Sequence, residues 1–289
     1  MKLALKIDVD TLRGTREGVP RLVELLKKHN AGATFLFSMG PDHTGRALRR
    51  VFRPGFFSKV SRTSVVEHYG IRTLLYGTLL PGPDIGLRCK DVMRATRDAG
   101  FEVGVHCWDH VRWQDFVADK DAAWTEREMN LACDRFQQVL GEATHTWGAA
   151  GWQTNVHAAR FQERFAYASD TRGTHPFLPV WNGHAAGCPQ VPTTLPTLDE
   201  LIGLRGDPVQ HLLMLADGRD HVFTAHAELE GGKLIGMFDA LLSGWSKQGY
   251  ELVGTDRMPL GRLPRHEVVY GEVPGRSGTL ALQGKELIG

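Results

Sequence analysis

Short apolar runs alternate along the chain with longer segments in which apolar residues recur every three or four positions. The first pattern is typical of buried strands and the second of helices that cover a sheet. We expect strands at residues 3–9, 33–37, 101–105, 165–168, 222–225 and 250–253. We expect helices at residues 16–28, 92–99, 125–140, 155–164, 207–215 and 233–247. Because strand and helix alternate strictly, the pattern predicts an α/β fold with a mostly parallel sheet, most naturally an α/β barrel. A capping box of Thr125 and Glu128 is expected to open the third helix.

Two stretches depart from this alternation. Residues 41–86 form a basic amphipathic insertion, in which the run from Arg46 to Arg62 interleaves six cations with apolar and aromatic residues and contains no acidic residue. Residues 259–289 are rich in Gly and Pro, and we expect an irregular C-terminal tail there. The expected organisation is one domain over residues 1–258, which includes the insertion, followed by this tail.

Composition excludes several classes of function. With 34 Lys and Arg against 33 Asp and Glu, the net charge of +1 gives no overall attraction for nucleic acid. No apolar run reaches the roughly 20 residues of a membrane span, and the N-terminal residues do not resemble a signal peptide, so we expect a cytoplasmic location. The four cysteines form no Cys-x-x-Cys pair, which favours reduced thiols over disulfides or a zinc ribbon.

A histidine pair follows the third expected strand. His106 and His110 stand four residues apart, so on a helical turn both imidazoles can reach one divalent metal ion. Two ordinary surface histidines would give the same spacing, so the pair needs support from elsewhere in the chain. Between them, we expect Cys107 to pack in the core and Asp109 to face solvent or to orient a histidine.

Two carboxylates end the first expected strand. Asp8 and Asp10 would be costly to bury without a cation or hydrogen-bond donors, and strand ends form the active-site face of an α/β barrel. One of them could complete a His₂Asp metal site with positions open for water and substrate, and the other suits a general base. The alternative is an Asx-type turn in which both aspartates cap the following loop.

A further histidine, His226, directly follows the strand expected at residues 222–225. If this strand belongs to the same barrel, His226 could protonate a leaving group at the mouth of the barrel. A purely structural histidine is the alternative.

These residues, in this order, resemble the motifs of the polysaccharide deacetylase (NodB homology) family, whose members are metal-dependent amidases on amino sugars with a deformed (β/α) barrel. Asp8 and Asp10 resemble its first motif, in the form with one residue between the aspartates. His106 and His110 resemble its His-x-x-x-His motif, and His226 the histidine of its last motif. The resemblance implies that Asp8 is the catalytic base and His226 the acid. It also implies one divalent ion, zinc, cobalt, manganese or iron, on Asp10, His106 and His110.

The family's Arg-x-Pro motif is not found, and residues 145–152 occupy the corresponding region. An arginine that orients the base is therefore in doubt. Trp152, Asp170 and Arg172 are candidates to bind the sugar or to orient the base and acid, with ordinary loop packing as the alternative.

Further motifs resemble the branch of the family that removes a formyl group from a formamido sugar carried on a polyprenyl phosphate. They are found at residues 13–20, 106–110, 149–152, 169–173, 195–200 and 226–231. This resemblance implies formate release in lipid A modification and cationic-peptide resistance. It also implies a peripheral place on the cytoplasmic face of the bacterial inner membrane, with no obligate protein partner.

The basic insertion gains a purpose from such a substrate, because a lipid-linked sugar cannot leave the bilayer. Its arginines could meet anionic headgroups while its phenylalanines enter the acyl boundary. The candidate docking residues are Arg49, Arg50, Phe52, Arg53, Phe56 and Phe57. The alternative is a helical hairpin packed on the barrel with a solvated cationic face.

Two other functions stay open at this point. A deacetylase of an N-acetylated glycan would use the same metal centre with a wider acyl pocket. A non-catalytic membrane-associated binding protein would keep the barrel without the chemistry, although the presence of all five candidate catalytic and metal-binding residues argues against it.

Overall fold

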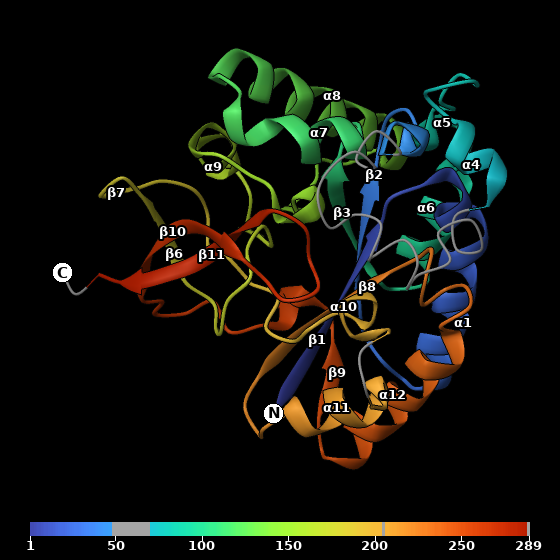
Figure 1. Cartoon of the computed structure of the whole chain (residues 1–289), viewed down its shortest axis with the longest axis vertical. Coiled ribbons are helices and arrows are strands. Elements are labelled where there is room, and N and C mark those ends of the chain that lie inside the picture. Colours follow the sequence, from blue (N-terminus) through green and yellow to red (C-terminus); the bar gives the residue numbers. More distant parts are fainter. Residues whose placement is uncertain (48–69, 204–205, 288–289) are drawn as a thin grey trace.

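Seven parallel strands form one curled sheet at the centre of the molecule (Figure 1). The structure is a computed structural model that describes residues 1–47, 70–203 and 206–287. The strand order is β5-β4-β3-β2-β1-β8, and β9 also pairs with β1. The strands are β1 (Lys2–Val9), β2 (Thr34–Ser38), β3 (Glu102–Cys107), β4 (Thr146–Trp147), β5 (Tyr167–Ala168), β8 (His221–His226) and β9 (Glu251–Val253). This half-barrel with helices confirms the α/β class, and an extended segment links its outer strands, since Val191 N donates to Ala168 O and Leu195 N donates to Val222 O.

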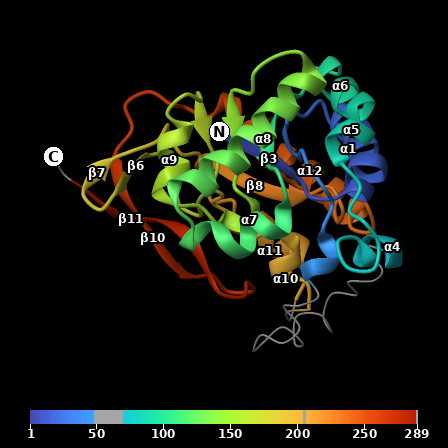
Figure 2. The same ribbon diagram turned by 90° about the horizontal axis from the view of Figure 1, so that it is seen from above.

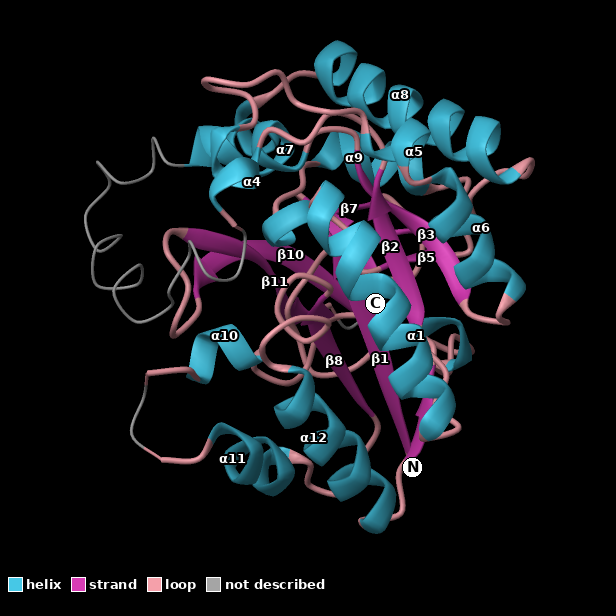
Figure 3. Ribbon diagram, turned by 90° about the vertical axis from the view of Figure 1, so that its right-hand side faces the viewer, coloured by secondary structure: helices cyan, strands magenta, loops and turns pink. Residues whose placement is uncertain are grey.

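Helices cover the outside of this sheet, and α1 and α12 lie in front of the strands in Figure 3. Along the cover, α1 packs against α6, α6 against α8, and α8 against α9, while α11 packs against α12. The α-helices are α1 (Val19–Lys28), α4 (Ile71–Leu75), α5 (Ile85–Arg88), α6 (Lys90–Asp98), α7 (His110–Phe116), α8 (Ala122–Leu140), α9 (Val156–Gln162), α10 (Leu198–Leu201), α11 (Pro208–Leu215) and α12 (Ile235–Lys247). A π-helical turn, Gly14–Gly18, precedes α1, and short 3-10 turns lie at Val117–Asp119, Ala150–Trp152 and Thr255–Arg257. None of the helices in the described ranges is long and apolar enough to cross a membrane.

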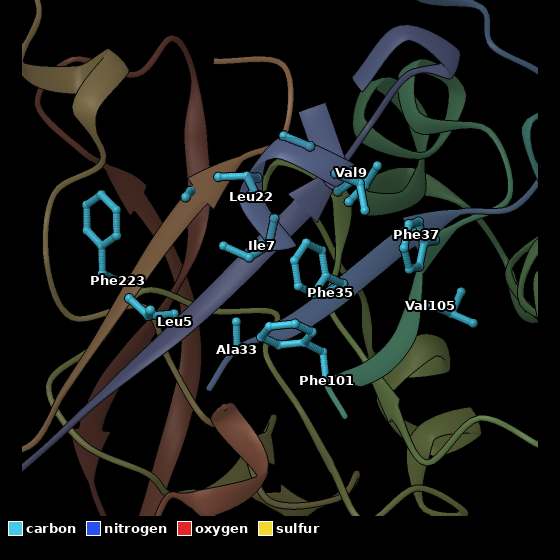
Figure 4. Packing of buried hydrophobic residues seen from close by; sticks show 14 of the residues in the cluster. Leu5, Ile7, Val9, Leu22, Ala33, Phe35, Phe37, Phe101, Val105 and Phe223 are labelled. Carbon is cyan, nitrogen blue, oxygen red and sulfur yellow. The ribbon is translucent and has the colours of Figure 1, made fainter. Parts of the chain in front are cut away.

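The two faces of β1 differ in chemistry because successive side chains point to opposite sides of a strand. Leu5, Ile7 and Val9 belong to the main core with aromatic residues of β2, as Figure 4 shows. On the other face, Ala4 packs in a small apolar cluster at the base of the sheet. The next residues on that inner face are Lys6, Asp8 and Asp10, all of them buried. The inner face of β1 therefore changes from apolar to charged toward its carboxyl end.

A second sheet corrects the expectation for the C-terminal residues. Its order is β11-β10-β6-β7, with β6 (Leu178–Trp181), β7 (His184–Ala185), β10 (Arg265–Glu272) and β11 (Thr279–Glu286). It lies on the side opposite α1 and α6 (Figure 2). The expectation of an irregular tail over residues 259–289 was wrong. The Gly and Pro content of these residues is typical of loops and gave no sign of strands. β10 pairs with β6, which is distant in the sequence, as well as with β11.

The start of α8 also differs from the sequence-based expectation. The helix begins at Ala122, one turn earlier than expected, and the Asp121 side chain accepts a hydrogen bond from Trp124 N at 2.9 Å. Thr125 donates its hydroxyl to Asp121 O within the helix. The capping box of Thr125 and Glu128 was therefore wrong, because a carboxylate cap was available four residues before Thr125.

The candidate membrane-docking residues lie outside the described residues. Arg49, Arg50, Phe52, Arg53, Phe56 and Phe57 all fall within residues 48–69. The docking hypothesis therefore stays a prediction.

Replacing Asp121 by Ala removes the cap of α8 and is expected to lower the free energy of unfolding by about 1 kcal/mol. Urea unfolding measures the difference. The control is Asp134→Ala, which removes an exposed carboxylate from the interior of the same helix and should leave stability unchanged or slightly raised. Equal losses in the two variants would contradict the assignment of Asp121 as the cap.

Candidate active site

Three of the predicted residues meet at the carboxyl end of the sheet. His106 lies at the end of β3, His110 begins α7, and Asp10 follows β1. Asp10 Oδ1 is 3.3 Å from His106 Nε2, and Asp10 Oδ2 is 3.4 Å from His110 Nε2. One oxygen and two ring nitrogens thus lie within 4.8 Å of one another. The structure brings together the residues predicted to bind the metal.

The hydrogen bonding of His106 fits a cation in this group. His106 Nδ1 lies 2.6 Å from Gly148 O, so Nδ1 carries the proton and donates it to the carbonyl. In the neutral ring, Nε2 then has only a lone pair to offer to Asp10 Oδ1. Asp10 Oδ1 is buried and has no hydrogen-bond partner among the described residues. Two electron-pair donors that face each other across 3.3 Å are stabilised by a shared proton or by a metal ion.

The charges of this group shift pKa values in opposite directions. Burial by itself would raise the pKa of Asp10, but His110 and His106 lower it below its usual range. Burial would lower the pKa of His106, but Asp8 and Asp10 raise it. The group therefore favours an ionised Asp10, the form that a metal ligand requires.

The predicted base, Asp8, lies beside the candidate metal-binding group. Asp8 is buried, and its Oδ1 lies 3.8 Å from His106 Nδ1, with no hydrogen-bond partner within the described part of the chain. Asp8 Oδ2 lies 3.4 Å from Lys6 Nζ. The predicted Asx-type alternative does not hold for Asp10, because the groups that follow it are satisfied from another element: Thr11 N donates to Glu228 Oε1 at 2.8 Å.

The predicted acid faces Asp8 across the strand pair. His226 ends β8, where it is the register partner of Asp8 on β1. Its ring is mostly buried, and Nδ1 lies 4.0 Å from Asp199 Oδ1. Arg276, from the turn between β10 and β11, holds Asp199 at 3.1 Å and Glu200 at 2.7 Å. The second sheet thus reaches the acid side of the site through Arg276.

Trp152 lies close to both His226 and Lys6. Its backbone lies in the left-handed region at φ 52°, and its ring is buried, with Nε1 donating to Thr193 Oγ1 at 3.1 Å. The ring meets His226 edge-on at 6.5 Å. Arg172 and Arg276 lie 5.0 and 4.8 Å from the ring centroid. A strained, buried Trp152 beside the acid fits a positioning role better than open contact with a sugar.

The two other candidate substrate-binding residues are held by protein partners. Arg172 Nη1 donates to Glu200 Oε1 at 2.6 Å. Asp170 is buried and accepts hydrogen bonds from Ala149 N at 2.8 Å and Gln162 Nε2 at 2.7 Å. Burial raises the pKa of Asp170 to about 6. Asp170 therefore anchors the loop after β4, which carries Gly148 O against His106.

Cys107 and Asp109, two of the three residues between His106 and His110, have different surroundings. Cys107 is buried, as expected, and its Sγ lies 3.4 Å from Ser38 Oγ. Asp109 is not solvent-facing: it is buried, caps α7 by accepting from Arg112 N at 3.1 Å, and lies 2.6 Å from His43 Nδ1. Asp109 thus fixes the first turn of the helix that presents His110.

Sequence reasoning missed Lys6, Asp199 and Arg276. Lys6 had a readable signal, because Lys6, Asp8 and Asp10 alternate with apolar residues along one strand. Asp199 lies in a short helix within the motif at residues 195–200 but was given no role of its own there, and Arg276 lies in a turn outside every motif.

Known proteins with this arrangement identify the family. The sequence profile of the polysaccharide deacetylase family matches residues 3–167, more than half of the chain, and this range includes Asp8, Asp10, His106 and His110.

The chain belongs to the polysaccharide deacetylase family.

Two relatives lie much closer to the chain than the family as a whole. A protein of Shewanella sediminis (strain HAW-EB3) is 36% identical over 98% of this chain and 94% of its own length. A protein of Wigglesworthia glossinidia brevipalpis is 32% identical over 94% of this chain and 99% of its own. Each is described as a probable 4-deoxy-4-formamido-L-arabinose-phosphoundecaprenol deformylase, ArnD. This member of the polysaccharide deacetylase family is therefore an amide-hydrolysing enzyme.

A solved structure supports the same fold. A protein from Mycobacterium smegmatis, described as a putative polysaccharide deacetylase, superposes with a TM-score of 0.59 at 16% identity, over 90% of this chain and 93% of its own. This likeness confirms the fold and carries no argument about the substrate.

Beside the acid, Glu230 gives a pH-dependent prediction for this family member. It accepts a hydrogen bond from His226 N at 2.8 Å, and burial raises its pKa from 4.5 to about 8. The folded state therefore holds this proton more tightly than the unfolded chain does, so its contribution is full below about pH 4.5 and is lost as pH rises to about 8. Glu230→Gln keeps the acceptor and removes the titration. Its free energy of unfolding is expected to fall less than that of the parent over this range.

Urea unfolding at a series of pH values tests this expectation. The control is Glu251→Gln on β9, an exposed position whose change should leave the pH dependence as in the parent. Parallel curves for Glu230→Gln and the parent would contradict a neutral, buried Glu230.

Proposed function

We propose that this enzyme removes the formyl group from 4-deoxy-4-formamido-L-arabinose linked to undecaprenyl phosphate, in the modification of lipid A. The observation that carries the proposal is the 36% identity, over 98% of the chain, to a relative described as that deformylase. The motifs at residues 169–173, 195–200 and 226–231 lie beyond the part matched by the family profile, and they supply Arg172, Asp199 and His226.

The residues of the site divide the reaction between them. A divalent ion held by Asp10, His106 and His110 would supply Lewis-acid polarisation of the formyl carbonyl and of the attacking water. Asp8 takes the proton of that water at Oδ1, the oxygen left without a partner among the described residues. His226 protonates the sugar nitrogen, because an amine leaves poorly without a proton. The negative charge of Asp199, 4.0 Å from His226 Nδ1, favours the protonated ring that this step requires.

Formate release from the formamido-arabinose polyprenyl phosphate tests the function directly. We expect turnover to disappear in metal-stripped protein, to return with added divalent metal, and to be lost in His106→Ala. His211→Ala is the matched control, since His211 is an exposed histidine on α11. Acetate from an N-acetylated glycan in place of formate would favour the rival deacetylase, and no product under any condition would favour a non-catalytic binding protein.

The metal ligands and the acid are separated by a second measurement. His110→Ala is expected to lose bound metal, because it removes one of three protein ligands, whereas His226→Ala should keep its metal and lose most turnover. Metal content by elemental analysis is read beside formate release for each variant. A strongly reduced metal content in His226→Ala would contradict its assignment as the acid.

Membrane docking by residues 41–86 is part of the same proposal, because the substrate is anchored in a bilayer. Charge reversal at Arg49, Arg50 and Arg53 is expected to weaken binding to liposomes that contain anionic lipid, and added salt should weaken the parent in the same way. The control reverses three exposed arginines elsewhere, Arg127, Arg219 and Arg257. Unchanged liposome binding in the first variant would remove the basic insertion from the docking surface.

A further inference from the structure

A lysine lies buried inside the sheet, next to the proposed base. Lys6 is 0% exposed and stands two residues before Asp8 on the inner face of β1. Its ammonium is 3.4 Å from Asp8 Oδ2 and donates to Ser169 O at 3.0 Å. It also lies 5.4 Å from the ring centroid of Trp152. The reaction as derived above gives this lysine no task.

A buried ammonium is costly unless a carboxylate compensates it. The carboxylate in contact with this ammonium is Asp8, whereas both oxygens of Asp170 already accept hydrogen bonds from Ala149 and Gln162. A methionine would fill a similar volume without the desolvation cost. The contact with Asp8 is therefore the one that compensates the buried charge of Lys6.

The surroundings leave space for this ammonium. A Cβ added at Gly148 would lie 3.1 Å from Lys6 Cε and 3.4 Å from Nζ, and only 2.3 Å from a methyl group of Leu36. The same Gly148 offers its carbonyl to His106. Gly148, just after β4, thus leaves room for Lys6 and also orients His106 through its carbonyl.

We propose that Lys6 is the positioning residue of the general base, which is a finer statement of the function proposed above and rests on it. Lys6 holds Asp8 by Oδ2, and this fixes the carboxylate so that Oδ1 stays toward His106 and free of hydrogen bonds from the described residues. The family's Arg-x-Pro motif, whose arginine would orient the base, is not found in this chain. Lys6, on the same strand as Asp8, orients the base instead.

The test compares Lys6→Met, Lys6→Arg and Asp8→Asn in the full-length protein, with formate release and metal content measured for each. Lys6→Met is expected to lower kcat by about 100-fold, the scale of a general-base contribution, with KM and bound metal unchanged. Lys6→Arg keeps the buried cation and should restore most of the turnover.

A double variant separates positioning from simple structural support. If Lys6 acts through Asp8, Lys6→Met adds no further loss to Asp8→Asn, because the group that it positions is already disabled. Thr224→Val is the matched control: Thr224 is the buried register partner of Lys6 on β8, and any loss that it causes should multiply with that of Asp8→Asn. The double variant also leaves no unpaired charge of the pair, so it stays informative if Lys6→Met alone folds poorly.

The outcomes keep the two proposals apart. A parent that releases formate together with a Lys6→Met variant of undiminished kcat would overturn the role of Lys6 and leave the function intact. Losses that multiply in the double variant would overturn it as well, as would a Lys6→Arg variant no better than Lys6→Met. A parent that releases no formate would instead overturn the function on which the proposal rests.

Discussion

A central strand of a curled sheet has two buried faces, and in this protein one face of β1 carries three charged side chains. Burying a lone charge is strongly unfavourable, so each of these side chains requires compensation from a neighbour. Lys6 pairs with Asp8 along the strand, Asp8 lies beside His106, and Asp10 lies between His106 and His110. The site is therefore a column of buried ionisable side chains in contact with one another inside the sheet.

Hydrogen bonds from groups outside this column hold several of its members in place. Ser169 O and Gly148 O hold Lys6 and His106 from the ends of β5 and β4. Glu228, from the loop after β8, accepts from the backbone of Asp10 and Thr11 and so sets the point at which β1 ends. Preorganised partners of this kind hold Asp10 and His106 in one arrangement within the folded chain.

Local periodicity in the sequence was enough to predict the long elements. The six expected strands lie within two residues of observed ones, and α9 and α11 follow the caps Asn155 and Asp207. Apolar strand ends followed by Asp and His were also enough to predict that Asp8, Asp10, His106, His110 and His226 lie close together. For Asp8, Asp10, His106 and His110, this local pattern alone was enough for the prediction.

The missed features depend on contacts that no local pattern records. β4 has two residues, and β10 depends on β6, which lies more than eighty residues earlier. The same pairing brings Arg276 to Asp199. A prediction that treated residues 259–289 as irregular therefore could not place Arg276 near His226. The alternation of β1 placed Lys6 on the same face as Asp8. A lysine is rarely buried, however, so only the structure shows that Lys6 is fully enclosed.

The connection from the β10–β11 turn to the acid also has a consequence for biosynthesis. Asp8, Asp10, His106 and His110 are all translated in the first half of the chain, whereas Arg276 follows His226 by fifty positions. A ribosome-bound chain can therefore assemble the metal-binding group while the clamp on Asp199 is still missing. The contact of Arg276 with Asp199, and with it the complete surroundings of His226, can form only after translation has passed Arg276.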